Sequence, residues 1–335
     1  MTRIIKLESI DVLKSTNDPI IIFSMNEESE ALKFACDENG IKVTAFCDNE
    51  IRKTKKPHCG IDTIYTPDLP KRFPNAKLYS DFREMLDKEN DIDAVTISTP
   101  DHVHAPAAVY AMERGKHVYV QKPITHNIRE ARMLTNLARK HKVVTQMGNQ
   151  GGSNPLLKMV QNWIDSGRVG KISEVKVWTN RPVWPQGVKM PSPNASLKPK
   201  SLDWNLWLGP ASQKEYTPNL HPFNWRGWWE YGTGALGDVG CHLIDIPFRT
   251  LGLKYPKSAE CSVGSVFTKM WNPDYFPEGC PPSSLITLNF DSTEKSKSPI
   301  ELTWTDGGIR PPHPDIIPAD SDIGGEDSLN GVLMI

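Results

Sequence analysis

The chain has 335 residues, a formal net charge of −1, 38% hydrophobic and 24% charged residues, which is typical of a soluble globular protein large enough for two domains. A near-zero charge without a clustered Lys/Arg excess excludes a nucleic-acid or anionic-membrane partner, and the absence of an apolar span or signal peptide predicts a cytoplasmic protein. Six cysteines without a C-x-x-C pair predict reduced thiols rather than a disulfide framework or a zinc site.

The first half of the chain alternates β-branched apolar runs with helical patterns. We expect strands over residues 19–23, 41–47, 94–98, 117–121 and 143–146, and helices over residues 27–39, 79–87, 102–115 and 127–141. This alternation predicts βαβ units in an α/β Rossmann-type fold with a doubly wound parallel sheet. Because ligands bind beyond the carboxyl ends of such strands, residues 1–147 are expected to form a dinucleotide-binding domain.

After residue 147 the pattern changes. We expect helices over residues 154–166 and 236–251, and longer strands over residues 172–179, 258–267, 284–291 and 299–304, with long loops between them. This order predicts an α+β domain with a mostly antiparallel open sheet over residues 148–335. All ten tryptophans follow residue 162 and 20 of the 28 prolines follow residue 150, so we expect this half to contact the substrate.

A lysine directly after the expected strand 117–121 carries one candidate chemistry. Lys122 is expected to project into the ligand crevice, where an ammonium group can hydrogen-bond a substrate hydroxyl and help to move its proton. A solvated loop lysine is the alternative interpretation, and the residues around Lys122 do not decide between the two.

A second motif lies on the expected helix 236–251. Asp238, His242 and Asp245 are spaced i, i+4 and i+7, so they share one helix face, and the glycines around them leave room for a ligand to approach the backbone. A carboxylate beside an imidazole fixes its tautomer and raises its basicity, which suits a general acid or base. A partly buried structural Asp–His pair and a metal site with a further carboxylate remain open as alternatives, although we expect no metal.

Taken together, these motifs resemble the Gfo/Idh/MocA family of NAD(P)-dependent oxidoreductases, which includes relatives of glucose–fructose oxidoreductase and inositol dehydrogenase. The resemblance extends over about residues 20–335 and rests on Phe46-Cys-Asp48, Thr99-Pro-Asp-His-Val-His104, the Lys122-Pro123 pair and Gly237-Asp238 with His242 and Asp245. It implies that Lys122, Asp238 and His242 surround the substrate carbon that gives up a hydride to nicotinamide. In this scheme Lys122 and His242 handle the hydroxyl proton and Asp238 orients His242.

The resemblance also implies a cofactor site. Asp48, at the end of the second expected strand and 24 residues after Ser24, corresponds to the acid that holds the adenosine ribose. NAD is favoured slightly over NADP because Asp48 repels a 2′-phosphate, although Arg52 and Lys53 offer it cations. The expected cofactor-binding residues are Ser24, Asn26, Asp48, Ser98, Thr99, Pro100, His104, Lys122, Pro123 and Gln150.

The Gly-x-Gly-x-x-Gly turn typical of the family is absent. Ser24-Met-Asn-Glu-Glu-Ser29 stands in its place, so Asn26 puts a side chain where a phosphate approaches the backbone, and acidic residues add negative charge there. Ser24 and Glu27 also have capping-box spacing, which satisfies helix N–H groups internally. The missing turn leaves a cofactor-deficient sugar-binding or regulatory relative as one alternative to an oxidoreductase. The resemblance leaves a second, NAD-dependent glycosidase-type chemistry, in which transient oxidation serves glycoside cleavage.

Aromatic and polar residues before Asp238 predict a sugar or cyclitol substrate, since such rings offer C–H faces for stacking and hydroxyls for hydrogen bonds. The expected substrate residues are His221, Trp225, Arg226 and Asp245. Residues 331–335 predict the start of a strand with no partner to follow, so the second domain is expected to lack its last strands, as a short form or a fragment. The resemblance further implies a homo-oligomer formed through the open sheet.

Overall fold

The computed structural model describes residues 77–321, 323 and 329–335, together with the backbone of three strands at residues 20–23, 43–48 and 63–65. The expected helix over residues 27–39, the segment 24–29, and Arg52 and Lys53 lie outside the described residues. The chain divides into two compact units that are not contiguous in sequence. The first comprises residues 1–97, 107–119 and 137–146, and the second comprises residues 98–106, 120–136 and 147–335. The single domain boundary expected at residue 147 stays a prediction.

The described strands of the first half of the chain form two three-stranded sheets. β1 (Ile20–Phe23), β2 (Val43–Asp48) and β3 (Thr63–Tyr65) form a parallel sheet in that order, which confirms the Rossmann-type fold class. β4 (Ala94–Ile97), β5 (His117–Gln121) and β6 (Thr145–Gly148) form the second sheet, also in chain order. Among the strands that the structure describes, only β3 was not predicted from the sequence, because a run of three residues is too short to show an apolar period.

The helices of this half begin and end at recognisable signals. α4 (Phe82–Lys88) starts after Asp81, whose carboxylate accepts from the backbone N–H of Arg83. α5 (Asp101–Glu113) is followed by Gly115 at φ +71°, and α6 (Ile128–His141) has a capping box. In that box the Asn127 side chain accepts from the N–H of Glu130, and the Glu130 carboxylate accepts from the N–H of Asn127. Local signals of one to four residues therefore mark these helix ends.

The second unit contains a five-stranded sheet with the order β11-β7-β10-β9-β8. Its strands are β7 (Glu174–Thr179), β8 (Ser258–Val263), β9 (Ser284–Phe290), β10 (Ile300–Thr305) and β11 (Asn330–Met334). Only the β7–β10 pair is parallel. β11 pairs antiparallel with β7, so the expected final strand has a partner earlier in the chain and satisfies backbone groups that β7 would otherwise leave open. That the second domain lacks its last strands stays a prediction.

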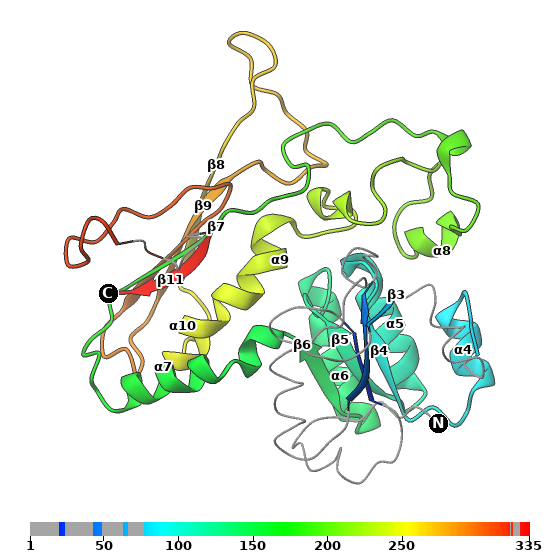
Figure 1. Ribbon diagram of the computed structural model, residues 1–335, viewed down its shortest axis with the longest axis horizontal. Helices are drawn as coiled ribbons and strands as arrows, with labels where there is room; N and C mark the ends of the chain where they lie inside the picture. The colour runs from blue at the N-terminus through cyan, green and yellow to red at the C-terminus, as the bar shows by residue number, and fades with distance from the viewer. Residues whose placement is uncertain (1–19, 24–42, 49–62, 66–76, 322, 324–328) are drawn as a thin grey trace. The chain divides into compact units, whose positions relative to one another are not determined.

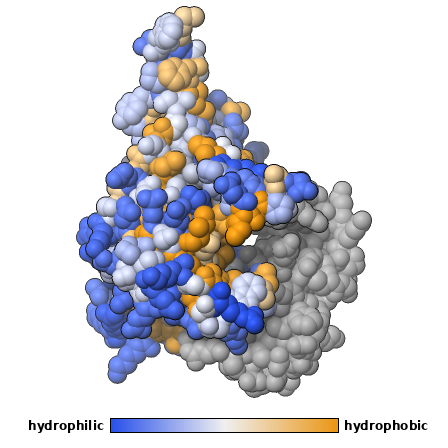
Figure 2. Space-filling model, turned by 90° about the vertical axis from the view of Figure 1, so that its left-hand side faces the viewer, coloured by the Kyte–Doolittle hydropathy of each residue, from blue (hydrophilic) through white to orange (hydrophobic). Residues whose placement is uncertain are grey.

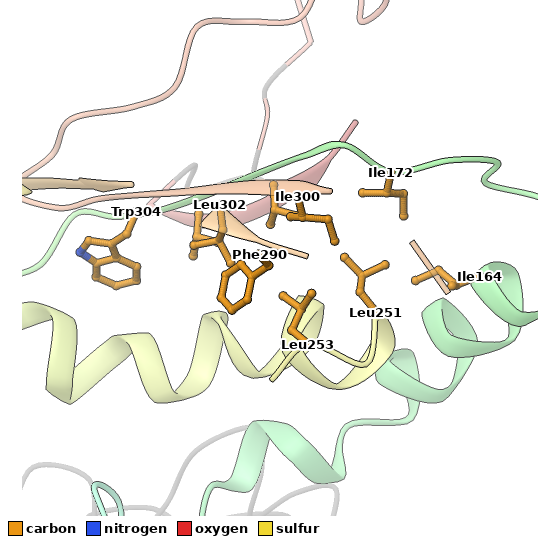
Figure 3. Packing of buried hydrophobic residues seen from close by; sticks show 10 residues of the cluster. Ile164, Ile172, Leu251, Leu253, Phe290, Ile300, Leu302 and Trp304 are labelled. Atoms are coloured by element: carbon orange, nitrogen blue, oxygen red, sulfur yellow. The ribbon is translucent and has the colours of Figure 1, made fainter. Parts of the chain in front are cut away.

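Three helices, α7 (Pro155–Asp165), α9 (Gly234–Leu243) and α10 (Asp245–Thr250), lie along one face of this sheet (Figure 1). The core between them is apolar and closely packed (Figure 3), with Leu251, Leu302 and Trp304 completely buried. The helix expected over residues 236–251 is divided at Ile244. Pro247 explains the division, because proline has no N–H to donate to the carbonyl of Leu243.

The remaining helical turns of the second unit are short and lie in its long loops. They are the 3₁₀ turns η3 (Gln150–Ser153), η4 (Ala195–Leu197) and η5 (Asn224–Gly227) and the helix α8 (Trp204–Leu208). No helix in the described residues is long and apolar enough to cross a membrane. Within the same residues Cys241, Cys261 and Cys280 are free thiols.

The loop between β8 and β9 projects from the sheet (Figure 1) and carries exposed aromatic and apolar side chains. Trp271 is 87% exposed there, whereas Trp304 in the core is fully buried. On this projection Figure 2 shows orange and blue side chains side by side. The tryptophans of the second half therefore occupy different environments, and their number alone does not mark one site.

Candidate active site

Lys122 and Asp238 form the centre of a polar cluster in the second unit. Lys122 follows β5 and precedes Pro123 through a cis peptide bond, and Asp238 lies in the second turn of α9. The Lys122 ammonium donates to Asp238 Oδ1 at 2.9 Å and to the Asp238 backbone carbonyl at 2.6 Å. Their side chains are 17% and 12% exposed, so the ion pair is shielded from solvent on most sides. Of the two interpretations of Lys122, the solvated loop lysine is therefore excluded.

Arg226 on η5 binds the same carboxylate. Its Nε donates to Asp238 Oδ1 at 3.2 Å, so one carboxylate oxygen receives two cations. Burial by itself raises the pKa of Asp238, but the charges and hydrogen bonds of Lys122 and Arg226 outweigh it and bring the pKa below its ordinary value. Asp238 is therefore ionised at neutral pH.

His242 lies one turn further along α9 and is held by Asn149 rather than by Asp238. The Asn149 Nδ2 donates to the Cys241 carbonyl at 2.8 Å, which leaves the amide oxygen facing His242 Nδ1, also at 2.8 Å. An amide oxygen only accepts, so the proton is on His242 Nδ1 and Nε2 carries the free lone pair. Burial and the charge of Lys122 lower the pKa of His242 to about 4, so the ring is neutral at physiological pH.

Asp101 joins the cluster from the first turn of α5. It is 3% exposed and accepts a hydrogen bond from Thr233 Oγ1, directly before α9, at 3.0 Å. Burial and the negative charge of Asp238 raise the pKa of Asp101 to about 7. The adjacent His102 ring lies against the carbonyls of Trp207 and Tyr231. These contacts fix the start of α9, and thereby Asp238 and His242, against the start of α5.

Other protein atoms fill the space beside the glycines before and within α9. This corrects the expectation that these glycines leave room for a ligand. A Cβ on Gly232 would lie 2.6 Å from Arg226 Cα, and a Cβ on Gly237 would lie 2.3 Å from the Thr233 side chain. Both distances are shorter than any contact that a side chain tolerates. The glycines therefore allow the chain to fold closely on itself and so position Arg226, Thr233 and Asp238.

Two models of one protein family match consecutive parts of the chain. The model described as an oxidoreductase family with an NAD-binding Rossmann fold matches residues 23–149, and the model of its C-terminal alpha/beta domain matches residues 154–259. Together they cover most of the chain and include Lys122, Asp238 and His242. The chain belongs to the Gfo/Idh/MocA oxidoreductase family.

Relatives in this family include enzymes named for carbohydrates. Levoglucosan dehydrogenase from Pseudarthrobacter phenanthrenivorans is 25% identical over 185 residues, which cover 55% of this chain and 39% of that protein. A glycosyl hydrolase family 109 protein from Shewanella pealeana is 30% identical over 142 residues, which cover 42% of this chain and 30% of that protein. The matched part of the chain thus spans about two fifths or less of these relatives.

A solved structure shows the same fold. The WlbA dehydrogenase from Bordetella pertussis, in complex with NADH and UDP-GlcNAcA, superposes with a TM-score of 0.51 at 17% sequence identity. The superposition covers 88% of this chain and 69% of that one.

Several residues expected to bind cofactor in this Gfo/Idh/MocA protein have other contacts. Both His104 ring nitrogens lie 2.7 Å from main-chain carbonyls, those of Thr99 and Pro123, which corrects the expectation that the ring binds cofactor directly. Burial lowers the pKa of His104, so the ring is neutral and donates one hydrogen bond, to one of these two carbonyls. Ser98 and Thr99 are exposed in that loop. The Gln150 Oε1 is buried without a partner in the described residues.

The expected substrate residues separate into two groups. Arg226 belongs to the cluster and His221 is exposed, but Trp225 is 4% exposed, donates its ring N–H to the Pro222 carbonyl and packs in an aromatic core, which corrects its expected role as a stacking surface. Asp245 begins α10 and pairs with Arg249, which also donates to the Gly152 carbonyl. Asp245 therefore fixes the loop beside Asn149 rather than extending the face of Asp238 and His242.

No group of three potential metal ligands occurs in the described residues, so the metal alternative has no ligand set there. Asn149 and Asp101 were missed by the sequence prediction. Asn149 lies 93 residues from His242, and no local pattern links the two. Asp101 did stand within the Thr99–His104 motif, but its burial depends on a contact 132 residues away.

Proposed function

We propose that this protein is a nicotinamide-dependent dehydrogenase that moves a hydride between its cofactor and a sugar or cyclitol carbon. The observation that carries the proposal is the pairing of a bound ammonium, Lys122, with a neutral imidazole of fixed tautomer, His242, beside the ionised Asp238. Oxidation of an alcohol needs a group that binds the oxygen and a group that accepts its proton. The two side chains supply one each.

The described residues fit the nicotinamide end of such a cofactor. Gln150 presents a buried acceptor without a protein partner, and a nicotinamide nucleotide offers ribose hydroxyls and a carboxamide N–H as donors. Pro100, Pro123 and Gln150 would line that end, and Asp48, the last residue of β2, would hold the adenosine ribose. When bound, the cofactor supplies the hydride donor or acceptor at C4 of its ring. We propose NAD rather than NADP, on the position of Asp48.

The chain's own groups then act on the substrate hydroxyl. Lys122 uses two of its three N–H donors on Asp238, which leaves one to hydrogen-bond the substrate oxygen. His242 Nε2 accepts the hydroxyl proton during oxidation and returns it during reduction. Asp238 positions Lys122, and Asn149 positions His242. Neither alternative, a cofactor-deficient binding protein or glycosidase-type chemistry, is better supported than a dehydrogenase.

Thermal unfolding with NAD⁺, NADH, NADP⁺ and NADPH at millimolar concentration tests the proposal. A ligand at 100 times its Kd stabilises the folded state by about 2.7 kcal/mol, so at least one of the four should raise the melting temperature. No shift with any of them, in a chain that unfolds cooperatively, would show that the dehydrogenase proposal is wrong.

The His242→Ala variant separates chemistry from cofactor binding. It should lose turnover and keep the cofactor-induced shift, because His242 acts on the proton and not on the cofactor. The His313→Ala variant is the matched control, since His313 is an exposed histidine of the same unit, and it should keep both.

A further inference from the structure

We infer that Arg226 forms an anion subsite beside the Lys122–Asp238 pair, so that the carbohydrate substrate carries a carboxylate or phosphate group. The inference rests on the proposed function, which puts the reacting carbon beside Lys122 and His242. It goes further because it names the chemical class of the substrate and the residue that selects this class.

The hydrogen bonds of Arg226 leave part of its guanidinium group available. Nε donates to Asp238, and Nη1 donates to the Phe223 carbonyl at 3.1 Å. A guanidinium carries five N–H donors, and neither Nη2 hydrogen has a partner in the described part of the chain. With the side chain 23% exposed, these donors are reachable from solvent.

The charges of the cluster do not balance. Lys122 and Arg226 are two cations that share one oxygen of one carboxylate, Asp238, and His242 is neutral. The second carboxyl nearby, Asp101, has a pKa raised to about 7 by its burial, so at neutral pH it offsets only part of the excess. Unpaired charge in a shielded site is unfavourable, and an anionic ligand group would offset it.

Arg226 is also held in place before any ligand arrives. Its guanidinium carbon lies 4.3 Å from the centre of the Trp225 ring and 4.5 Å from that of Phe223. Gly232 packs closely against the Arg226 backbone. Trp225 is 4% exposed and Phe223 is 44% exposed, so Arg226 lies between a buried ring and one that reaches the surface. A fixed guanidinium loses little side-chain entropy on binding, which favours affinity.

The chemistry of the free donors selects the ligand class. A planar guanidinium binds carboxylate and phosphate oxygens through paired N–H donors, while neutral hydroxyls leave the charge excess in place. The carboxylate of a sugar acid and the phosphate of a sugar phosphate satisfy the same N–H donors. The structure therefore indicates an anionic group on the sugar, and binding experiments distinguish carboxylate from phosphate.

Calorimetric titrations with D-glucuronate, D-glucose 6-phosphate and D-glucose at constant ionic strength test the inference. Loss of a charge-assisted hydrogen bond corresponds to about 10- to 100-fold in affinity. We expect the chain to bind one anionic probe at least about tenfold more tightly than glucose, and Arg226→Gln to abolish that preference. The stronger anionic probe identifies carboxylate or phosphate. The Arg226→Lys variant should retain part of the preference for the anionic probe, because lysine keeps the charge without the planar fork.

The matched control is Arg168→Gln, an exposed arginine of the same unit that should leave all three affinities unchanged. Absence of an anionic preference in the wild-type chain overturns the inference, and this holds even where Arg226→Gln does not fold. An anionic preference that survives in folded Arg226→Gln overturns it as well. Because these titrations need no cofactor, an Arg226-dependent preference without any cofactor-induced thermal shift would contradict the proposed function and leave the inference standing.

Discussion

The protonation state of His242 is set by residues that no local sequence pattern connects to it. A carboxylate four residues earlier, Asp238, predicted an Asp–His pair, but Lys122 and Arg226 take that carboxylate. Asn149 binds His242 instead, through an amide whose orientation the Cys241 carbonyl fixes. The sequence thus predicted which three side chains gather and not how they pair, because pairing depends on contacts between segments about a hundred residues apart.

Replacing the Asn149 amide by a carboxylate should change the titration of His242. In Asn149→Asp the new negative charge accepts from Nδ1–H and favours the imidazolium, so the pKa of His242 should rise above its present value of about 4 by roughly one unit or more. Histidine resonances followed by NMR against pH measure this directly. Asn289→Asp, on β9 and bonded to Ser258, is the control and should not move the His242 resonance. An unchanged His242 titration in Asn149→Asp would contradict the assigned hydrogen bond.

At the scale of elements, signals carried by one residue and its neighbours were the most predictable. Asn154 and Pro155 start α7 within one residue of the expected position, and the capping box of α6 is similarly local. The division between α9 and α10 and the packing of the α9 glycines were not predicted. Both depend on what each residue meets in the folded chain, which spacing along a helix does not reveal.

Two glycines of α9 should respond differently to alanine. In Gly237→Ala the added Cβ would lie 2.3 Å from Thr233, which must move and release Asp101, so we expect a loss of about 1–3 kcal/mol in the free energy of unfolding. In Gly240→Ala the nearest atom is the flexible end of Leu236 at 3.1 Å, and the gain in helix propensity offsets that contact to within about 1 kcal/mol. Urea unfolding of both variants compares them. Equal losses would show that the Thr233 contact is unimportant.

For the whole molecule, apolar periodicity was sufficient to predict the fold class and the positions of most described strands along the chain. It was insufficient for the organisation into units, because residues 98–106 and 120–136 group with the second unit through long-range contacts such as Asp101–Thr233 and Lys122–Asp238. The composition bias that first separated the two halves has a practical use. All ten tryptophans lie in the second unit, so tryptophan fluorescence reports the unfolding of that unit alone.

The buried titratable groups of the second unit predict opposite pH dependences. His102 and His242 have pKa values of about 4 in the folded chain, below the ordinary 6.5, so the unfolded chain binds more protons between these values. Their contribution to stability is therefore present above about pH 6.5 and is lost as the pH falls toward 4. Asp101 acts in reverse: its folded pKa of about 7 exceeds the ordinary 3.8, so stability is lost as the pH rises through that range.

The lowered pKa values of His102 and His242 together outweigh the raised pKa of Asp101, so these three groups predict a net loss of stability on acidification. The Asp101→Asn variant isolates the opposing contribution of Asp101. Asparagine stays neutral, so this variant should match the wild type near pH 4 and exceed it at pH 8, by up to about 4 kcal/mol at roughly 1.4 kcal/mol per pKa unit. Its stability should consequently fall more steeply than that of the wild type between pH 6.5 and 4.5. Urea unfolding followed by tryptophan fluorescence at pH 8, 6.5, 5 and 4.5 measures both curves.

The control variant is Asp165→Asn. Asp165 is a carboxylate on the exposed side of α7 whose pKa is lowered by Lys295, so this variant should not gain stability at pH 8. A constant difference between Asp101→Asn and the wild type across this range would mean that Asp101 is ionised throughout, and the charge excess at Arg226 would then be smaller than a raised pKa of Asp101 implies.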